Sequence, residues 1–365
     1  MPEPLRVAID ARYWRATIQT GVERYMHLLT EALAATPTSV DLAVVLTENH
    51  APAYTAANTE RDVRVLTVPD RREHHLHRVV DNFDADLVHY PFSLPARLHR
   101  PSVFTLHDAG RYLFPEQMVR EVRDVQNPRL LHMVDDPMLR AVITVSETSR
   151  SDIIGALGTF DHTPLEVVPN FVCRDFAYRL RSPAHELAPN TPFLFGVGVY
   201  MPSKNIPRLT RAYRLARAAA PDLVPPRLLL AGRRGWERGL PSPQDPEITV
   251  LGHIDDDQLA ALYTAASAFV FPTLFEGFGI PAQESLAAGC RLLCSDLPVL
   301  REVTADLAVF ADPHDEDAMA KGIVEVCDTP RPDPAAVQAL LRRYSAAPVG
   351  ARLLDVYHRA ALHSV

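Results

Sequence analysis

Short apolar runs alternate with longer amphipathic stretches along the first half of the chain. The run at residues 5–9 predicts a strand, and residues 21–35 follow it with Tyr25, Leu28 and Leu29 on one helical face. The runs are continuously apolar, which is typical of parallel strands buried on both faces. The other strands predicted in this half are 42–46, 86–89, 102–106 and 141–145, and a helix capped by Ser146 is predicted to end near Gly155.

The same alternation starts again at residue 193. Residues 181–192 contain three prolines and no hydrophobic period, so they are predicted to form a linker. Strands are predicted at 193–197, 227–231, 248–251, 268–271 and 291–294, and helices at 206–220, 256–266, from about Pro281, at 316–327 and at 350–363. Two doubly wound α/β domains follow from this pattern, and 365 residues match two domains of roughly 150 residues each. We expect boundaries of 1–185 and 186–345, with a separate C-terminal helix in 346–365.

Composition removes several classes of protein. With 37 basic and 45 acidic residues the net charge is −8, which disfavours a nucleic-acid binder. No apolar run reaches 18 residues, and the first residues lack the pattern of a signal peptide. The four cysteines lack zinc spacing and are expected to be free thiols. These features predict a cytoplasmic protein.

The cluster 74–77, with three histidines between arginines, is more typical of a solvated basic face than of a membrane contact or a metal site.

The segment 272–289 carries the richest chemistry. It predicts a strand end, a loop with Gly277 and Gly279, and a helix with Pro281 in its first turn. Free amides at 279–282, with the helix dipole, would suit a diphosphate. Glu276 precedes the loop and Glu284 is expected in the first helical turn. The two carboxylates could form an acid/base pair or accept hydrogen bonds from sugar hydroxyls. A simple turn and a favourable helix start explain them equally well.

Lys204 is unusual because the chain has only two lysines against 35 arginines. It follows a predicted strand that ends in glycines and precedes a predicted helix. A compact ammonium suits one phosphate oxygen as a point charge. The alternative is a solvent-exposed lysine without a partner. A dinucleotide site fails on spacing, because Met201 stands where the third glycine of that motif would lie.

Two weaker signals lie in the first half. Gly21 starts a predicted helix after the first strand, where a phosphate could approach the backbone. His107 ends a predicted strand, which places it at the ligand edge of a parallel sheet. Most glycines at such positions only make turns, and a lone histidine is more often a core residue.

The spacing of Glu276 and Glu284 matches the E-x7-E motif of retaining glycosyltransferases, and the whole chain resembles a family-4 glycosyltransferase of the GT-B fold. That fold has two Rossmann-like doubly wound domains that face each other across a cleft. The resemblance implies that residues 1–185 bind the acceptor, that 186–345 bind a nucleotide sugar, and that the last helix returns to the first domain. The segments that carry it are 9–12, 20–25, 86–89, 106–108, 141–146, 168–170, 202–205, 231–236, 251–253, 272–289 and 300–303.

The resemblance also implies roles for single residues. Gly21 would contact the donor diphosphate and His107 would lie beside the transferred sugar. Lys204 would hold the β-phosphate, Glu276 the sugar hydroxyls and Glu284 the ribose. The remaining residues expected around the donor are Ser203, Gly252, His253, Ile254, Gly277, Phe278, Gly279 and Ile280. One departure matters, because the family often has arginine where Ser203 stands. Arg208, Arg233 and Arg234 are unranked substitutes for the missing cation.

The implied reaction is transfer of a hexose from a nucleoside-diphosphate sugar to a hydroxyl, with retention at the anomeric carbon. No cofactor is expected, since the nucleotide sugar is a co-substrate, and no metal, since the lysine and the helix terminus already offer positive charge. The motif style resembles bacterial mannosyl- and rhamnosyltransferases, which favours GDP-mannose as donor. The acceptor, saccharide or lipid-linked, is not readable, nor is the oligomeric state, and peripheral membrane contact stays open. The alternatives are a nucleotide-sugar 2-epimerase and a non-catalytic nucleotide-sugar-binding subunit.

Overall fold

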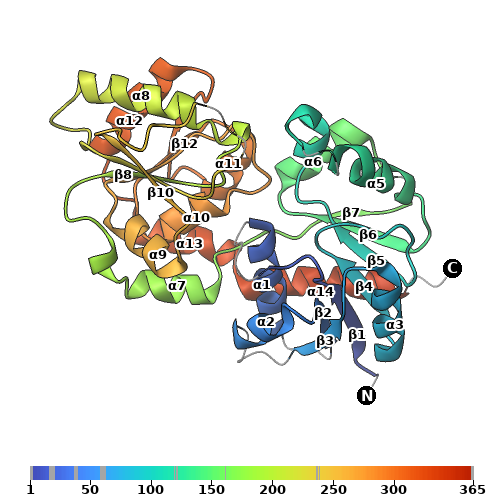
Figure 1. Ribbon diagram of the computed structural model, residues 1–365. Helices are drawn as coiled ribbons and strands as arrows, with labels where there is room; N and C mark the ends of the chain where they lie inside the picture. Colours follow the sequence, from blue (N-terminus) through green and yellow to red (C-terminus); the bar gives the residue numbers. More distant parts are fainter. Residues whose placement is uncertain are drawn as a thin grey trace. The chain divides into compact units, whose positions relative to one another are not determined.

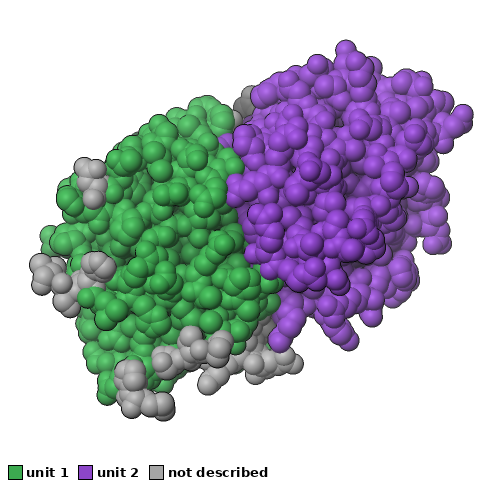
Figure 2. All heavy atoms as spheres, turned by 180° about the vertical axis from the view of Figure 1, so that it is seen from behind, with its two compact units in different colours: residues 1–170, 345–365 green, residues 171–344 purple. Residues whose placement is uncertain are grey.

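The computed structural model describes residues 3–15, 21–36, 40–57, 63–118, 120, 122–160, 162–235, 237 and 239–362. Thr20 and Trp236, which contribute to the resemblance, lie outside these ranges. The chain forms two compact units, each described by itself below (Figure 1 and Figure 2). Unit 1 comprises residues 1–170 and 345–365, and unit 2 comprises residues 171–344.

Unit 1 contains a seven-stranded parallel sheet in the order β3-β2-β1-β4-β5-β6-β7. Its strands are β1 (Leu5–Asp10), β2 (Val40–Thr47), β3 (Arg64–Val68), β4 (Leu87–Tyr90), β5 (Ser102–Thr105), β6 (Leu139–Thr144) and β7 (Leu165–Val167). In the centre of the sheet, Ala8 of β1 pairs with Ala43 on one side and Val88 on the other. The strand order reverses between β1 and β4, and the carboxyl ends there form the usual ligand edge of such a sheet.

The helices of unit 1 cover this sheet. They are α1 (Gly21–Ala34), α2 (Ala51–Ala57), α3 (Glu73–Phe83), α4 (Gly110–Leu113), α5 (Asn127–Met133), α6 (Glu147–Leu157) and α14 (Ala346–Leu362), with a 3-10 turn at Pro115–Gln117 and a π turn at Val122–Gln126. The predicted cap of α6 is confirmed, because the Ser146 side chain accepts from the Ser149 amide at 2.9 Å. In unit 1, the sequence analysis missed the strands β3 and β7 and the helices α2, α3, α4 and α5. The apolar stripe of α3, formed by Leu76, Val80 and Phe83, is narrow and lies among histidines.

The C-terminal helix α14 packs against α1, as the red and blue ribbons of Figure 1 show. The contact is close, because a Cβ added at Gly350 would lie 2.1 Å from the Ala32 carbonyl oxygen. The helix begins at Ala346, earlier than the predicted residue 350. Pro348 does not delay its start, because a helix leaves its first amides without partners and a proline there loses nothing.

Unit 2 contains a six-stranded parallel sheet in the order β10-β9-β8-β11-β12-β13. Its strands are β8 (Leu194–Val197), β9 (Leu228–Ala231), β10 (Ile248–Gly252), β11 (Ala268–Phe271), β12 (Leu292–Ser295) and β13 (Val309–Ala311). Its helices are α7 (Arg174–Arg181), α8 (Ile206–Ala219), α9 (Asp256–Ala265), α10 (Ile280–Ala287), α11 (Pro298–Thr304), α12 (Glu316–Asp328) and α13 (Pro334–Arg343), with 3-10 turns at His185–Leu187 and Pro202–Lys204. Here the strand order reverses between β8 and β11.

The units divide between Asn170 and Phe171, before the expected boundary after residue 185. Helix α7 packs on α9, with the buried Phe176 ring 6.2 Å from that of Tyr263. The proline-rich segment 181–192 therefore lies inside unit 2. Proline content indicated a chain without regular structure there, but it could not indicate which sheet the preceding helix covers.

Candidate functional site

Lys204 and Glu276 meet at the carboxyl edge of the unit 2 sheet. Lys204 ends the 3-10 turn after β8, and Glu276 lies in the loop after β11, so they flank the point where the strand order reverses. Their side chains form an ion pair between Nζ and Oε1 and are 20% and 14% exposed. The Lys204 ammonium also lies 5.5 Å from the centre of the Phe271 ring. A cation and a carboxylate are thus held together where a ligand of this fold would bind.

Close backbone packing supports this lysine. A Cβ at Gly198 would lie 3.5 Å from Cδ of Lys204, so the lysine stem passes directly over this glycine. A Cβ at Gly232, where φ is +134°, would lie 1.8 Å from the Gly198 carbonyl oxygen, so no other residue fits. The Gly232 amide in turn donates to the Gly252 carbonyl at 2.7 Å. The loops after β8, β9 and β10 are therefore joined through their backbones.

The turn that carries Lys204 is also fixed to the loop that carries Glu276. The Ser203 carbonyl accepts from the Leu274 amide at 2.7 Å and from Thr273 Oγ1 at 2.9 Å. Asn205 donates through Nδ2 to the carbonyls of Pro272 and Pro313, at 3.0 and 2.7 Å. The sequence analysis missed these anchors, because amide and hydroxyl side chains beside prolines are typical of any loop.

The helix start after Gly279 offers fewer amides than the sequence suggested. Gly279 caps α10 in a left-handed conformation, with φ of +90°. Pro281 has no N–H, and the Ala282 amide donates to the Gly279 carbonyl at 3.0 Å. Across the described ranges, the amides of Gly279 and Ile280 donate to no protein acceptor. The expectation of free amides throughout 279–282 was wrong, because Ala282 already closes the first turn of the helix.

Other predicted donor residues lie around the same edge. Phe278 is buried against Tyr344, with ring centres 5.5 Å apart, and the Ile280 side chain is buried too. At both positions the backbone, rather than the side chain, is therefore what a ligand could contact. Gly252 adopts φ of +74° in the turn after β10. His253 in that turn is exposed and Ile254 is half-buried. Gly277 is buried in the loop between Glu276 and α10.

Glu284 lies in the second turn of α10, not the first, because the helix begins at Ile280. It is buried and accepts a hydrogen bond from the Tyr263 hydroxyl at 3.2 Å. A tyrosine of α9 therefore orients this carboxylate.

In unit 1, Gly21 is the exposed first residue of α1. His107 follows β5, is half-buried, and has Nε2 3.1 Å from the Pro91 carbonyl oxygen. A carbonyl only accepts, so Nε2 carries the hydrogen and Nδ1 carries the lone pair. The Tyr25 ring lies 4.7 Å from the His107 ring at 82°. Burial lowers the pKa of His107 to about 4, so the imidazole is neutral at pH 7.

Behind His107 lies a buried hydrogen-bonded group that the sequence analysis missed. We call Tyr357, His89, Thr105 and Tyr25 the His89 network. Nδ1 of His89 lies 2.6 Å from the Tyr357 hydroxyl, and Nε2 lies 2.7 Å from Thr105 Oγ1. Thr105 Oγ1 lies 3.0 Å from the Tyr25 hydroxyl. Burial, with His89 wholly inaccessible, lowers its pKa to about 3.

His89 should make unit 1 sensitive to mild acid. Its folded pKa of about 3 lies below the ordinary value of 6.5, so the unfolded state takes up a proton first as pH falls. Unit 1 is expected to lose about 2 kcal/mol of its free energy of unfolding between pH 7 and pH 5 through this group. Urea denaturation at both pH values measures the loss, which His89→Gln should reduce and His74→Gln, at an exposed histidine, should not. An equal loss in all three proteins would contradict the assignment.

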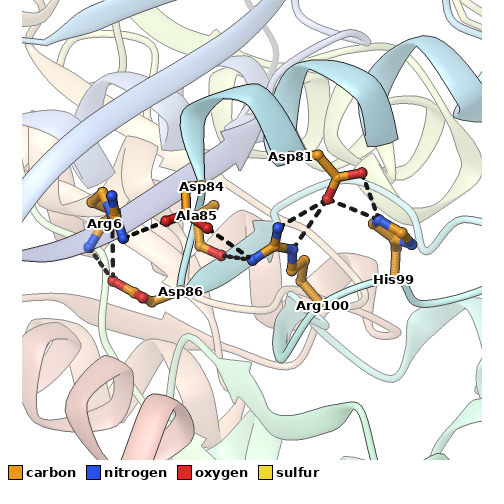
Figure 3. Close-up of polar contacts among 7 residues, drawn as sticks. All are labelled: Arg6, Asp81, Asp84, Ala85, Asp86, His99 and Arg100. Carbon is orange, nitrogen blue, oxygen red and sulfur yellow. Dashed lines mark hydrogen bonds and ion pairs between the residues drawn. The ribbon is translucent and has the colours of Figure 1, made fainter.

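The expectation of no metal also assumed that the chain lacks D-x-D triplets, a common metal-binding pattern. That assumption was wrong, because such triplets occur at 84–86, 255–257 and 315–317. Asp84 and Asp86 pair with Arg6, and Asp84 also pairs with Arg100, at the amino edge of the sheet (Figure 3). Asp255 and Asp315 cap α9 and α12. Ion pairs and helix caps therefore account for these triplets. Over the residues that the structure describes, no group of three or more His, Cys, Asp or Glu side chains is placed to hold a metal ion.

The remaining sequence features are local. In the histidine cluster, the His77 ring stacks on His99 at 4.6 Å, and His99 bonds Asp81 (Figure 3). All four cysteines are free, with Cys290 and Cys294 buried. In the described part of the chain, no helix has the length and apolar character that crossing a membrane requires.

Comparison with known proteins places these features in a family. The model described as Glycosyltransferase Family 4 matches residues 19–176, and the model described as Glycosyl transferases group 1 matches residues 180–339. O-antigen chain mannosyltransferase B of Escherichia coli is 34% identical over 251 residues, which is 64% of this chain and 63% of that protein. O-antigen chain mannosyltransferase RfbU of Salmonella typhimurium is 26% identical over 239 residues, with the same coverage of 64% and 63%. The matches thus span less than two thirds of these relatives.

Solved structures show the same fold. WaaG, a glycosyltransferase involved in lipopolysaccharide biosynthesis, matches with a TM-score of 0.65 and 13% identity over 96% of this chain and 99% of that chain. A glycosyltransferase from Rickettsia africae matches with a TM-score of 0.66 and 11% identity over all of both chains. The two parallel-sheet α/β units are those of the GT-B fold, which confirms the predicted fold class.

Proposed function

The chain belongs to the family-4 glycosyltransferases, and from this membership and the geometry of its site we propose that it transfers a hexose from a nucleoside-diphosphate sugar to an acceptor hydroxyl with retention. One observation carries the proposal. The Lys204–Glu276 pair lies where the unit 2 strand order reverses, close in sequence to a helix start with two free amides. A cation and free amides suit a diphosphate, and a carboxylate suits sugar hydroxyls.

In this proposal, the Lys204 ammonium and the amides of Gly279 and Ile280 bind the diphosphate. Glu276 accepts hydrogen bonds from the transferred sugar. Glu284, oriented by Tyr263, accepts them from the ribose. The turn Gly252–Ile254 flanks the base, and the backbone of Gly277 and Phe278 lines the site.

We propose that Arg233 supplies the positive charge that an arginine at position 203 often provides in the family. Arg208 is engaged, since it donates to Asn205 Oδ1 at 2.6 Å and to the Pro313 carbonyl at 3.2 Å. Arg233 and Arg234 follow β9, and neither side chain forms a hydrogen bond or ion pair with another described residue. Arg233 is the half-buried one, and its carbonyl accepts from the Tyr200 amide at 3.0 Å, beside the Lys204 loop.

Within unit 1, Gly21 and His107 are the proposed donor-binding residues. The exposed amide end of α1 at Gly21 suits a phosphate group. The neutral His107 imidazole directs its Nε2 hydrogen to Pro91, so its Nδ1 lone pair is available to a hydroxyl of the transferred sugar.

The proposed reaction breaks the bond between the anomeric carbon and the phosphate oxygen and forms one to the acceptor oxygen on the same face. The acceptor's proton passes to the departing phosphate oxygen. Lys204 and the two free amides would stabilise the charge that builds on this leaving group. We propose that this stabilisation replaces that of a metal ion.

GDP-mannose is the proposed donor, because both relatives above are named mannosyltransferases, and the acceptor is proposed to be a saccharide or lipid-linked saccharide. A thermal-shift screen with GDP, UDP and dTDP tests the nucleotide. GDP at about 100 times its Kd is expected to stabilise unit 2 by about 2.7 kcal/mol, and UDP and dTDP much less. Lys204→Ala should lose most of the shift. A shift with UDP or dTDP alone would reject GDP-mannose, and no shift with any nucleotide would reject the site.

A further inference from the structure

Two residues of the His89 network come shortly before Pro91 and His107 in the sequence. His89 and Pro91 are two residues apart at the end of β4, and Thr105 and His107 are two residues apart at the end of β5. The bond between His89 Nε2 and Thr105 Oγ1, at 2.7 Å, therefore ties together the two strand ends that carry the Pro91 carbonyl and the His107 ring.

The same network reaches His107 from a second direction. Thr105 Oγ1 holds the Tyr25 hydroxyl at 3.0 Å, and the Tyr25 ring packs against the His107 ring. On the far side, the Tyr357 hydroxyl of α14 holds His89 Nδ1 at 2.6 Å. The path from α14 to the His107 ring thus consists of three hydrogen bonds and one ring contact.

Packing alone does not require these polar groups. Phenylalanine at 357 and 25 and valine at 105 would fill the same volumes without burying hydroxyls, and leucine at 89 would avoid burying an imidazole. A buried polar network fixes one geometry, because every displaced member leaves a partner unsatisfied. Such a network is useful where one side chain must be held in one orientation.

We propose that Tyr357, His89, Thr105 and Tyr25 are positioning residues for His107, so that the C-terminal helix sets the orientation of this imidazole toward the transferred sugar. The inference rests on the proposed function, in which His107 binds that sugar. It extends the site to α14, whose Tyr357 lies 268 residues from His89 in the sequence.

The first test removes single hydroxyls. Tyr357→Phe and Thr105→Val are expected to weaken binding of GDP-mannose roughly three- to tenfold, and to lower the rate of GDP release from it to a similar degree. The Kd for GDP, measured by calorimetry, should stay within about twofold, because GDP lacks the sugar. Thr105→Ser keeps the hydroxyl and should retain most of the wild-type affinity for GDP-mannose.

Tyr213→Phe is the matched control. The Tyr213 hydroxyl is buried in unit 2 and donates to the Pro225 carbonyl at 2.9 Å. Its removal should lower the melting temperature, because a buried hydrogen bond is lost. The ratio of the Kd for GDP-mannose to the Kd for GDP should stay unchanged. A ratio that changes as much in this control as in Tyr357→Phe would overturn the inference.

A double-mutant cycle separates positioning of His107 from a general effect. In a His107→Ala background, Tyr357→Phe should change the ratio of Kd values by less than about twofold, because no imidazole remains to be positioned. Equal effects in both backgrounds, or no effect of Tyr357→Phe and Thr105→Val in the wild type, would overturn the inference. Failure of the proposed function looks different: the wild type would then bind GDP-mannose no better than GDP, or His107→Ala would leave the ratio intact.

Discussion

Replacing Lys204 by alanine is expected to lower the rate of transfer from GDP-mannose by about 10²–10³, because one contact to charge that develops in a transition state is worth that much. The lysine pairs with Glu276 at the edge where the donor is proposed to bind. The chain supplies a matched control in its only other lysine. Lys321 is exposed on α12, so Lys321→Ala should retain wild-type turnover.

Two companion variants sharpen this result. Glu276→Gln should also lower turnover strongly, since an amide presents one acceptor oxygen to sugar hydroxyls where the carboxylate presents two. Arg233→Ala should raise the KM for the donor with a smaller effect on kcat, as expected for a residue that binds the donor equally well in the ground state and in the transition state. Steady-state kinetics of GDP release measure all three. Near-wild-type turnover in both Lys204→Ala and Glu276→Gln would show that the site is wrongly assigned.

Arg12→Met is expected to cost unit 1 about 3–5 kcal/mol of its free energy of unfolding, because it leaves a buried carboxylate without its cation. Arg12 and Asp10 are each 2% exposed, and the guanidinium bonds both carboxylate oxygens, at 2.7 and 2.9 Å. Arg12 also donates to the Arg71 carbonyl at 2.5 Å, which joins the end of β1 to the loop after β3. The melting temperature of unit 1 should fall by about 6–20 °C.

An exposed pair gives the comparison. Arg120, whose side chain is 89% exposed, pairs with Asp124, and Arg120→Met should cost less than about 1 kcal/mol. In the double variant Asp10→Leu and Arg12→Met, much of the lost free energy of unfolding should be recovered, because no buried charge remains unpaired. Calorimetry of the four proteins measures these differences. Equal stability of Arg12→Met and the wild type would mean that the pair is hydrated in solution.

Local sequence already indicated where the chemistry of unit 2 lies. Glu276, Gly279 and Lys204 each follow an apolar run, and a parallel sheet brings the carboxyl ends of such runs to one edge. The same reasoning placed His107 at the edge of unit 1. Motif spacing supplied the family, which the comparisons confirmed. The local hydrophobic pattern failed to predict α3, because the apolar stripe of this helix is narrow. It also failed to show that the Ala282 amide is bonded, because the partner of this amide is set by the first turn of α10.

By itself, the sequence determined the parallel sheets, most of their strands, and the strand ends that carry polar side chains, because each follows from an apolar run within a few residues. Only the tertiary structure decided which side chains meet. Lys204 and Glu276 are 72 residues apart, and His89 and Tyr357 are 268 apart. The tertiary structure also assigned α7 to unit 2, whereas the family resemblance had already implied that the last helix returns to the first unit. The reason is physical: a hydrophobic period states that a face will be buried, whereas the partner of that face depends on crossover connections and close backbone contacts that no local pattern encodes.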